Sequence, residues 1–233
     1  MMHRAALQFT VGFILMISPV VCQAGGGNKE FSAPSATKGT RPDANQMAVE
    51  NLLRHAGDIF DLARAGRWDK AEKRLVDLRK AENSLRLIMN EENSFYLQRL
   101  GKKVEDLGRA VAVRNRKDAM HYANRITLID VALMGQFKLR VPTDVMVLDY
   151  CGRELEILAE EKDFEKMSGL VLRMHLVWQN LMPQLIDKGA TREIKKFSEI
   201  MKRLEVAKTP EEFGQSSRQV LDEVDNLEKV FMK

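Results

Sequence analysis

The chain has 233 residues, of which 45% are hydrophobic and 30% are charged. It is therefore too apolar to be disordered throughout and too charged for a protein with many membrane spans. Aromatic residues make up only 6%, and helix formers such as Leu, Ala, Glu and Lys dominate, so we predict an all-α fold. The 37 basic and 33 acidic residues leave a net charge of +4, which does not indicate a nucleic-acid partner.

Residues 1–24 have the pattern of a secretory signal peptide. Arg4 precedes an apolar stretch at 9–21, and Ala24 is a small residue at the expected cleavage position. The apolar stretch is shorter than the roughly 20 residues that a membrane helix needs, so cleavage is favoured over a retained anchor. We expect a periplasmic or secreted protein that does not span the membrane once the leader is removed.

Lipidation of Cys22 is an alternative fate of this leader. The residues before Cys22 look like a lipobox, but Val21 stands where bacterial lipoboxes have Gly, Ala or Ser. The following segment, 25–43, mixes Gly, Ser, Pro and Thr with few apolar residues, and such a composition cannot offset the entropy of ordering. We therefore expect a flexible linker at 25–43 and a fold that begins at residue 44.

Beyond the linker, apolar residues recur at alternating spacings of three and four, which is the spacing of amphipathic helices. An unbroken example comprises Phe164, Met167, Val171, Met174, Trp178, Leu181 and Leu185. Short polar or glycine-containing breaks divide the chain into eight helices, at 65–67, 90–91, 115–117, 135–142, 162, 189 and 208–209. Because such short connections make neighbouring helices antiparallel, we predict four helical hairpins.

The longest break divides these hairpins into two subdomains, 44–137 and 143–233. Whether they form two four-helix bundles, one bundle or a short solenoid stays open at this point. A hint of duplication crosses the break, because Leu62 and Trp68 are matched by Leu158 and Phe164, in each case 96 positions later. The alternative is a coincidence between similar amphipathic hairpins.

Sequence motifs for catalysis are missing. The chain has no Cys-x-x-Cys-His, no His-Glu-x-x-His, no phosphate-binding loop and no Gly-x-Ser-x-Gly. Cys151 is the only cysteine left after leader removal, and it is more simply a buried thiol than a nucleophile paired with His121 or His175. We therefore expect a protein that is not an enzyme.

Two Met-His dipeptides raise the possibility of a soft metal site. Met120-His121 and Met174-His175 bring together residue types that bind copper, or haem inside a helical bundle. The competing interpretation is that the methionines fill the core, since adjacent residues on a helix diverge by about 100° and do not converge on one ion.

Two acidic residues interrupt apolar stripes. Glu82 falls within the stripe that begins at Trp68, and Asp130 falls within the series that includes Ile126 and Leu133. If both were buried, each would need a hydrogen bond or a cation, and together they would mark a site. We expect instead that each lies at a stripe edge and reaches water.

Charge is distributed unevenly, with a basic segment at 99–117 and an acidic segment at 149–165. These segments could recognise a charged partner, could attract each other, or could be solvated helix faces. Without catalytic motifs, we expect a non-catalytic binding or interaction module of the cell envelope, whose partner is an envelope protein or a small ligand. The alternative is a periplasmic copper or haem carrier that uses the Met and His residues above.

Overall fold

The computed structural model describes residues 44–89, 94–134 and 139–232. The predicted leader 1–24, Cys22 within it, and the predicted linker 25–43 lie outside these ranges. Every secondary-structure element in the described part is a helix, which confirms the all-α prediction. None of the described helices is both long enough and apolar enough to cross a membrane.

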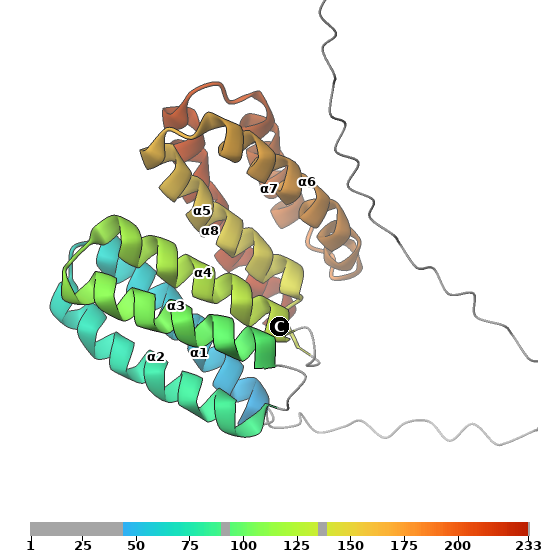
Figure 1. Cartoon of the computed structure of the whole chain (residues 1–233). Coiled ribbons are helices and arrows are strands. Elements are labelled where there is room, and N and C mark those ends of the chain that lie inside the picture. Colours follow the sequence, from blue (N-terminus) through green and yellow to red (C-terminus); the bar gives the residue numbers. More distant parts are fainter. Residues whose placement is uncertain (1–43, 90–93, 135–138, 233) are drawn as a thin grey trace, which may run out of the picture. The chain divides into compact units, whose positions relative to one another are not determined.

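The first four helices form a closed bundle (Figure 1). Helix α1 packs against both α2 and α4, and α3 completes the ring by packing against the same two helices. We call this unit the N-terminal bundle; its helices are α1 (Ala44–Arg64), α2 (Trp68–Ile88), α3 (Ser94–Ala112) and α4 (Arg116–Met134).

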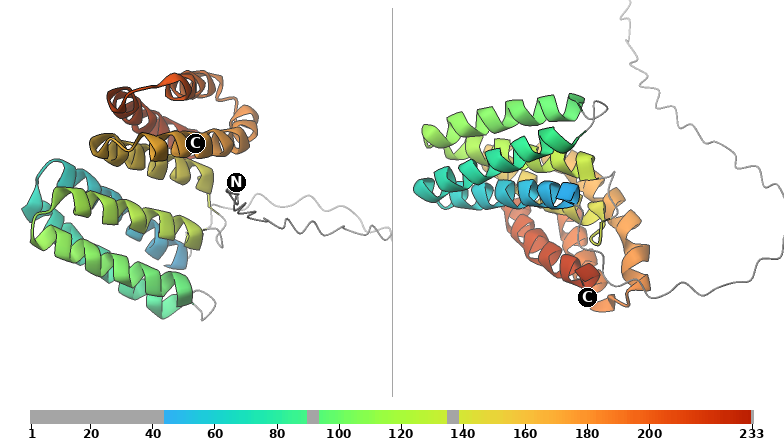
Figure 2. Two further views of the ribbon diagram at one scale, coloured as in Figure 1. Left: turned by 45° about the horizontal axis from the view of Figure 1, so that its top comes forward. Right: turned by 90° about the horizontal axis from the view of Figure 1, so that it is seen from below.

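The last four helices repeat this arrangement (Figure 2). Helix α5 packs against α6 and α8, and α7 packs against the same two helices. The contacts that close each ring, α1 with α4 and α5 with α8, would be missing in an open solenoid, so the fold is a pair of four-helix bundles. The C-terminal bundle comprises α5 (Thr143–Glu161), α6 (Phe164–Asp187), α7 (Thr191–Val206) and α8 (Pro210–Met232).

Turns that are 96 residues apart have the same backbone geometry in the two bundles. Gly66 and Lys162, whose numbers differ by 96, both have left-handed backbones, with φ of 68° and 58°. In each turn the next backbone N–H closes the helix end, by donating to the carbonyl of Leu62 at 2.8 Å and of Leu158 at 3.1 Å. The α1–α2 and α5–α6 hairpins therefore share one turn geometry.

Helix ends follow local capping rules. Thr209 and Glu212 form a capping box at the start of α8: the Glu212 N–H donates to Thr209 Oγ1 at 3.3 Å, and the Thr209 N–H donates to Glu212 Oε2 at 3.1 Å. Gly189, with φ of 67°, ends α6 as predicted. The break expected at 115–117 lies earlier, because the Asn115 side chain accepts the N–H of Asp118 at 3.2 Å and caps a helix that already begins at Arg116.

Ion pairs join the two bundles where α4 packs against α5. Arg116 contacts Glu160 at 2.7 Å, and Lys117 contacts Glu161 at 2.9 Å. The basic and acidic segments therefore meet at their ends, as one of the sequence-based alternatives proposed. Exposed pairs of this kind stabilise a fold only weakly.

A buried polar cluster, which we call the polar junction, strengthens the same interface. Asn124 of α4 is fully buried, and its amide donates to the Tyr150 carbonyl at 3.2 Å and to Glu154 Oε2 at 2.8 Å. Arg125 donates to the Tyr150 hydroxyl at 2.9 Å and to Glu154 Oε1 at 3.1 Å. Buried polar groups of this kind need their specific partners, so the junction fixes α4 against α5.

Candidate functional site

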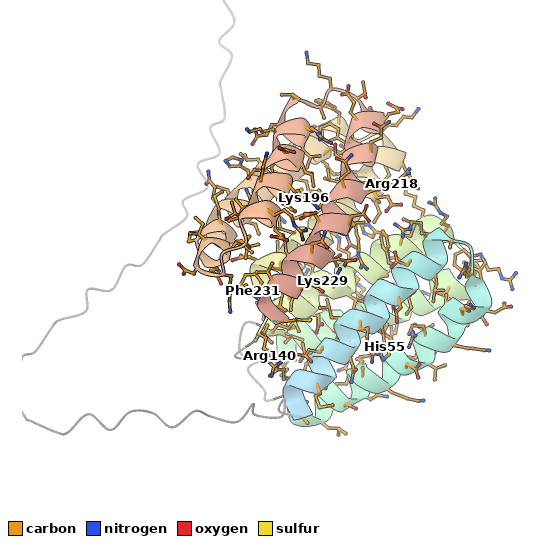
Figure 3. All side chains as sticks on the ribbon, turned by 180° about the vertical axis from the view of Figure 1, so that it is seen from behind. His55, Arg140, Lys196, Arg218, Lys229 and Phe231 are labelled. Carbon is orange, nitrogen blue, oxygen red and sulfur yellow. The ribbon has the colours of Figure 1, made fainter. Side chains whose placement is uncertain are left out.

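A groove of about 800 Å³ lies where α1, residues 139–141, α5 and α8 meet. Figure 3 views this side of the molecule and shows Arg140 between the end of α8 and the start of α1. Apolar side chains form part of the wall: Leu53, Met134, Leu139, Val141, Met146 and Met232. The charged lining residues are Glu50, Asp58, Asp61, Asp149, Asp225 and Glu228, with Arg54, Arg140 and Arg153.

Arg153 of α5 spans the space between the bundles and reaches α1. Its Nε bonds Asp149 at 3.2 Å, and its guanidinium lies 5.2 Å from the centre of the Phe60 ring. A Cβ atom on Gly57 of α1 would lie 2.9 Å from Arg153 Nη1, so a glycine at this position makes room for the guanidinium. Because Nη1 is buried, it is not open to an anionic ligand in the groove.

Three carboxylates, which we call the acidic corner, gather beside Arg153: Asp149 of α5 with Asp225 and Glu228 of α8. Burial raises the pKa of Asp149 despite the nearby Arg153. Burial also raises the pKa of Glu228, and the negative charges of Asp149 and Asp225 add to that effect. The positive charges of Arg153 and Lys229 offset part of the effect on Glu228.

Other acidic lining residues already have partners. Asp58 pairs with Arg74 at 3.0 Å, and Asp61 pairs with Arg64 at 2.8 Å. Asp225 and Glu228 form no hydrogen bond or ion pair with any residue that the structure describes. These two carboxylates are thus the ones open to a ligand.

In each Met-His dipeptide, the methionine and the histidine point in different directions, as expected for adjacent residues on a helix. Met120 and Met174 are buried in the core, while the histidine next to each one turns toward the surface. His121 is half-buried, which lowers its pKa, and His175 bonds Glu205 of α7 at 2.7 Å through Nδ1.

The two dipeptides lie on α4 and α6, which belong to different bundles. Among the described residues, no group of three or more His, Cys, Asp or Glu side chains is arranged to hold a metal ion. The copper or haem site therefore remains a prediction for which the geometry supplies no ligand set.

Cys151 lies on the buried face of α5. Its side chain is fully buried, and burial raises the pKa of the thiol to about 12. At neutral pH the sulfur stays protonated, which is unfavourable for a nucleophile or a metal ligand. The placement fits the interpretation of Cys151 as a packed core residue.

The expectation that Glu82 and Asp130 reach water is wrong for both residues. Glu82 is 8% exposed and accepts hydrogen bonds from Arg86 at 2.9 and 2.7 Å, so an arginine of the same helix neutralises it. Asp130 is fully buried on α4, and neither of its carboxyl oxygens has a hydrogen bond. The apolar stripes around both positions are wider than the sequence pattern suggested.

Asp130 lies close to the groove. It precedes the lining residue Met134 by one helical turn, and its carboxyl group approaches the backbone of Leu53, another lining residue. Burial raises the pKa of Asp130 well above its ordinary value, because the charged form loses its hydration there.

Sequence reasoning missed the residues that form the acidic corner and its arginine. Asp149 and Arg153 are four residues apart on α5, and Asp225 and Glu228 are three residues apart on α8, so each pair shares a helix face. The interval of 96 residues offered a further signal, since it aligns Gly57 with Arg153. Only the tertiary structure shows that these faces meet.

No model of a known protein family matches the chain, and neither does any curated protein or any solved structure. The groove must therefore be interpreted from its own shape and chemistry.

Proposed function

We propose that this chain is an exported, non-catalytic binding protein that holds a small ligand in the groove between its two bundles. The observation that carries the proposal is the groove itself, whose volume of about 800 Å³ lies within the range of small-molecule sites, roughly 300–1,000 Å³. It combines an apolar wall with a few convergent charged groups, which is the usual composition of such sites. Export is supported by the signal-peptide pattern at 1–24.

The chemistry of the lining residues supports binding over catalysis. None of the described residues that line the groove is a Ser, Thr, Cys, His or Lys, so the groove lacks the side chains most often used as nucleophiles. Cys151 is buried and protonated, and His175 is engaged by Glu205 and Gln179. These placements favour a protein that acts by holding its ligand.

The test compares one groove-filling variant with one matched surface variant. Glu50 is exposed on α1 and lines the groove, whereas Glu72 is exposed on α2 and does not. We expect small molecules extracted from the cell envelope to raise the melting temperature of the wild-type protein and of Glu72→Trp, but not of Glu50→Trp. A ligand at 100 times its Kd stabilises the folded state by about 2.7 kcal/mol, which a thermal melt resolves readily.

The identity of the stabilising compound would then follow from fractionation and mass spectrometry. Stabilisation that persists undiminished in Glu50→Trp would place the binding site outside the groove and overturn the proposal. So would the failure of every envelope fraction to stabilise the wild-type protein.

A further inference from the structure

We infer that the ligand is a small organic cation, with a primary ammonium group held at the acidic corner and an apolar chain lying along the groove wall. The inference rests on the proposed function and specifies the chemistry that the groove recognises. It follows from the carboxylates at the acidic corner, from the contacts that Arg153 already makes with Asp149 and Phe60, and from the apolar residues next to them.

The charge balance of the acidic corner favours a cation. Asp149 pairs with Arg153, whereas Asp225 and Glu228 have no hydrogen bond or ion pair among the described residues. Carboxylates that lie together in a partly buried site repel one another, and an incoming positive charge relieves that repulsion. A cationic ligand therefore gains interactions that the protein itself leaves unmade.

An anion would find no comparable site at this corner. Arg153 already has partners: its Nε is held by Asp149 and its guanidinium lies over the Phe60 ring. The unpartnered Nη1 atom is buried against Gly57 and not exposed to the groove. Recognition of a ligand carboxylate or phosphate would require this packing to break.

An ammonium group suits the corner better than a bare metal ion. Among the described residues no group of three or more His, Cys, Asp or Glu side chains is arranged to ligate a metal. A primary ammonium has three rotatable N–H donors and tolerates longer and less regular distances than metal ligation does. It can therefore hydrogen-bond carboxylates that come from two different helices.

The wall beside the corner suits the rest of such a molecule. Leu53 and Met146 line the groove on α1 and α5, and Val141 lines it between α4 and α5. Methylene groups that lie against these side chains are removed from water, so an alkyl chain adds to the binding. A cation without an apolar part would leave this wall exposed.

Asp130 provides a second, independent sign that the groove is a binding site. Its carboxyl group is fully buried, has no side-chain partner among the described residues and approaches the backbone of the lining residue Leu53. Buried polar groups without partners are rare in folded proteins and need an explanation. A polar group of a ligand that reaches this carboxyl group would supply such a partner.

Isothermal titration of the full chain with 1,6-diaminohexane tests the inference directly. This probe carries ammonium groups on a six-carbon chain, and 1,6-hexanediol is its neutral control. We expect the diamine to bind the wild-type protein and the diol not to bind. The double variant Asp225→Asn/Glu228→Gln should weaken diamine binding at least about tenfold, since it removes two charge-assisted hydrogen bonds.

A matched variant separates local recognition from net charge. Asp222→Asn/Glu211→Gln removes two exposed acidic residues from the same helix, and neither of them lines the groove. This variant should bind the diamine as the wild-type protein does. Equal weakening in both double variants would show a general charge effect and overturn the inference.

The remaining outcomes distinguish this inference from the proposed function. If the envelope compound that stabilises the wild-type protein but not Glu50→Trp is neutral or anionic, the groove binds a ligand but not a cation. If a lysine-containing peptide binds while the diamine does not, the ligand is a polypeptide and the inference fails. If the diamine binds Asp225→Asn/Glu228→Gln as tightly as the wild-type protein, it binds away from the acidic corner and the inference fails.

Discussion

The two bundles share one topology and use equivalent positions for opposite purposes. Asn124 and Arg125 of α4 correspond, 96 residues later, to Val220 and Leu221 of α8. The first pair reaches across to α5 through the polar junction, whereas the second pair packs against Gly152 inside the C-terminal bundle. The same helix surface thus joins the bundles in one half and closes a core in the other.

A second pair of equivalent positions creates the groove. Arg153 of α5 corresponds to Gly57 of α1, and the structure places the arginine against the glycine. One bundle supplies the large charged side chain and the other supplies the space for it. Two bundles of the same topology can therefore build an asymmetric site at their interface when a few facing positions differ.

The strongest test of this comparison uses equivalent core leucines. Leu52 of α1 and Leu148 of α5 are both fully buried, and their numbers differ by 96. We expect Leu52→Ala and Leu148→Ala each to lower the free energy of unfolding by about 2–5 kcal/mol, because each leaves a cavity. Urea denaturation measures the loss.

The two tryptophans show whether the bundles unfold together. Trp68 reports on the N-terminal bundle and Trp178 on the C-terminal bundle, so Trp68→Phe and Trp178→Phe backgrounds isolate each signal. We expect one shared transition, since the polar junction couples the bundles. If Leu148→Ala moves only the transition reported by Trp178, the bundles are independent.

Substitution within the polar junction should have the next largest effect. Asn124→Leu removes both donors that the amide offers to α5 and deprives the buried Glu154 of one hydrogen bond. We expect a loss of about 2 kcal/mol and a separation of the two tryptophan transitions. Asn180→Leu, at an exposed position of α6, is the control and should change neither quantity.

The variant Asp130→Asn tests how the buried carboxyl group affects stability. Asparagine is also the residue type found 96 positions later, at Asn226. The pKa of Asp130 is raised in the folded state, so the folded protein keeps a proton that the unfolded chain releases above pH 3.8. The wild-type protein therefore loses stability as pH rises from that value toward the folded pKa, whereas the variant does not titrate at this position.

The variant should consequently be more stable than the wild-type protein at pH 8, by an amount on the order of 1 kcal/mol, and nearly equal to it below pH 3.8. Urea midpoints at both pH values measure the difference. An advantage of the same size at both pH values would contradict the assigned titration of Asp130.

The smallest expected effect compares two glycines within helices. Gly169 of α6 has open space where a Cβ would lie, so Gly169→Ala should stabilise the protein by about 0.5–1 kcal/mol. Gly57→Ala should give no such gain, because its Cβ would push the Arg153 guanidinium away from the Phe60 ring. Equal thermal shifts in the two variants would show that Gly57 does not make room for Arg153.

The sequence allowed the helices and most of their ends to be predicted, because these depend on local rules. The spacing of the stripe from Phe164 to Leu185, the left-handed Gly189 and the Thr209–Glu212 capping box each involve residues within a few turns of one another. The burial of Asp130 could not be predicted in this way, since it depends on how closely α1 covers α4.

What the sequence by itself determined is the all-helical character of the chain, with eight helices within the described residues, and the burial of Cys151. The tertiary structure alone decided that the helices close into two bundles and that Arg153, Gly57, Asp225 and Glu228 meet at one groove. The physical reason is the distance along the sequence over which each interaction acts. Helix periodicity and capping involve residues within a few positions of one another, whereas the groove requires packing to bring α1, α5 and α8 together.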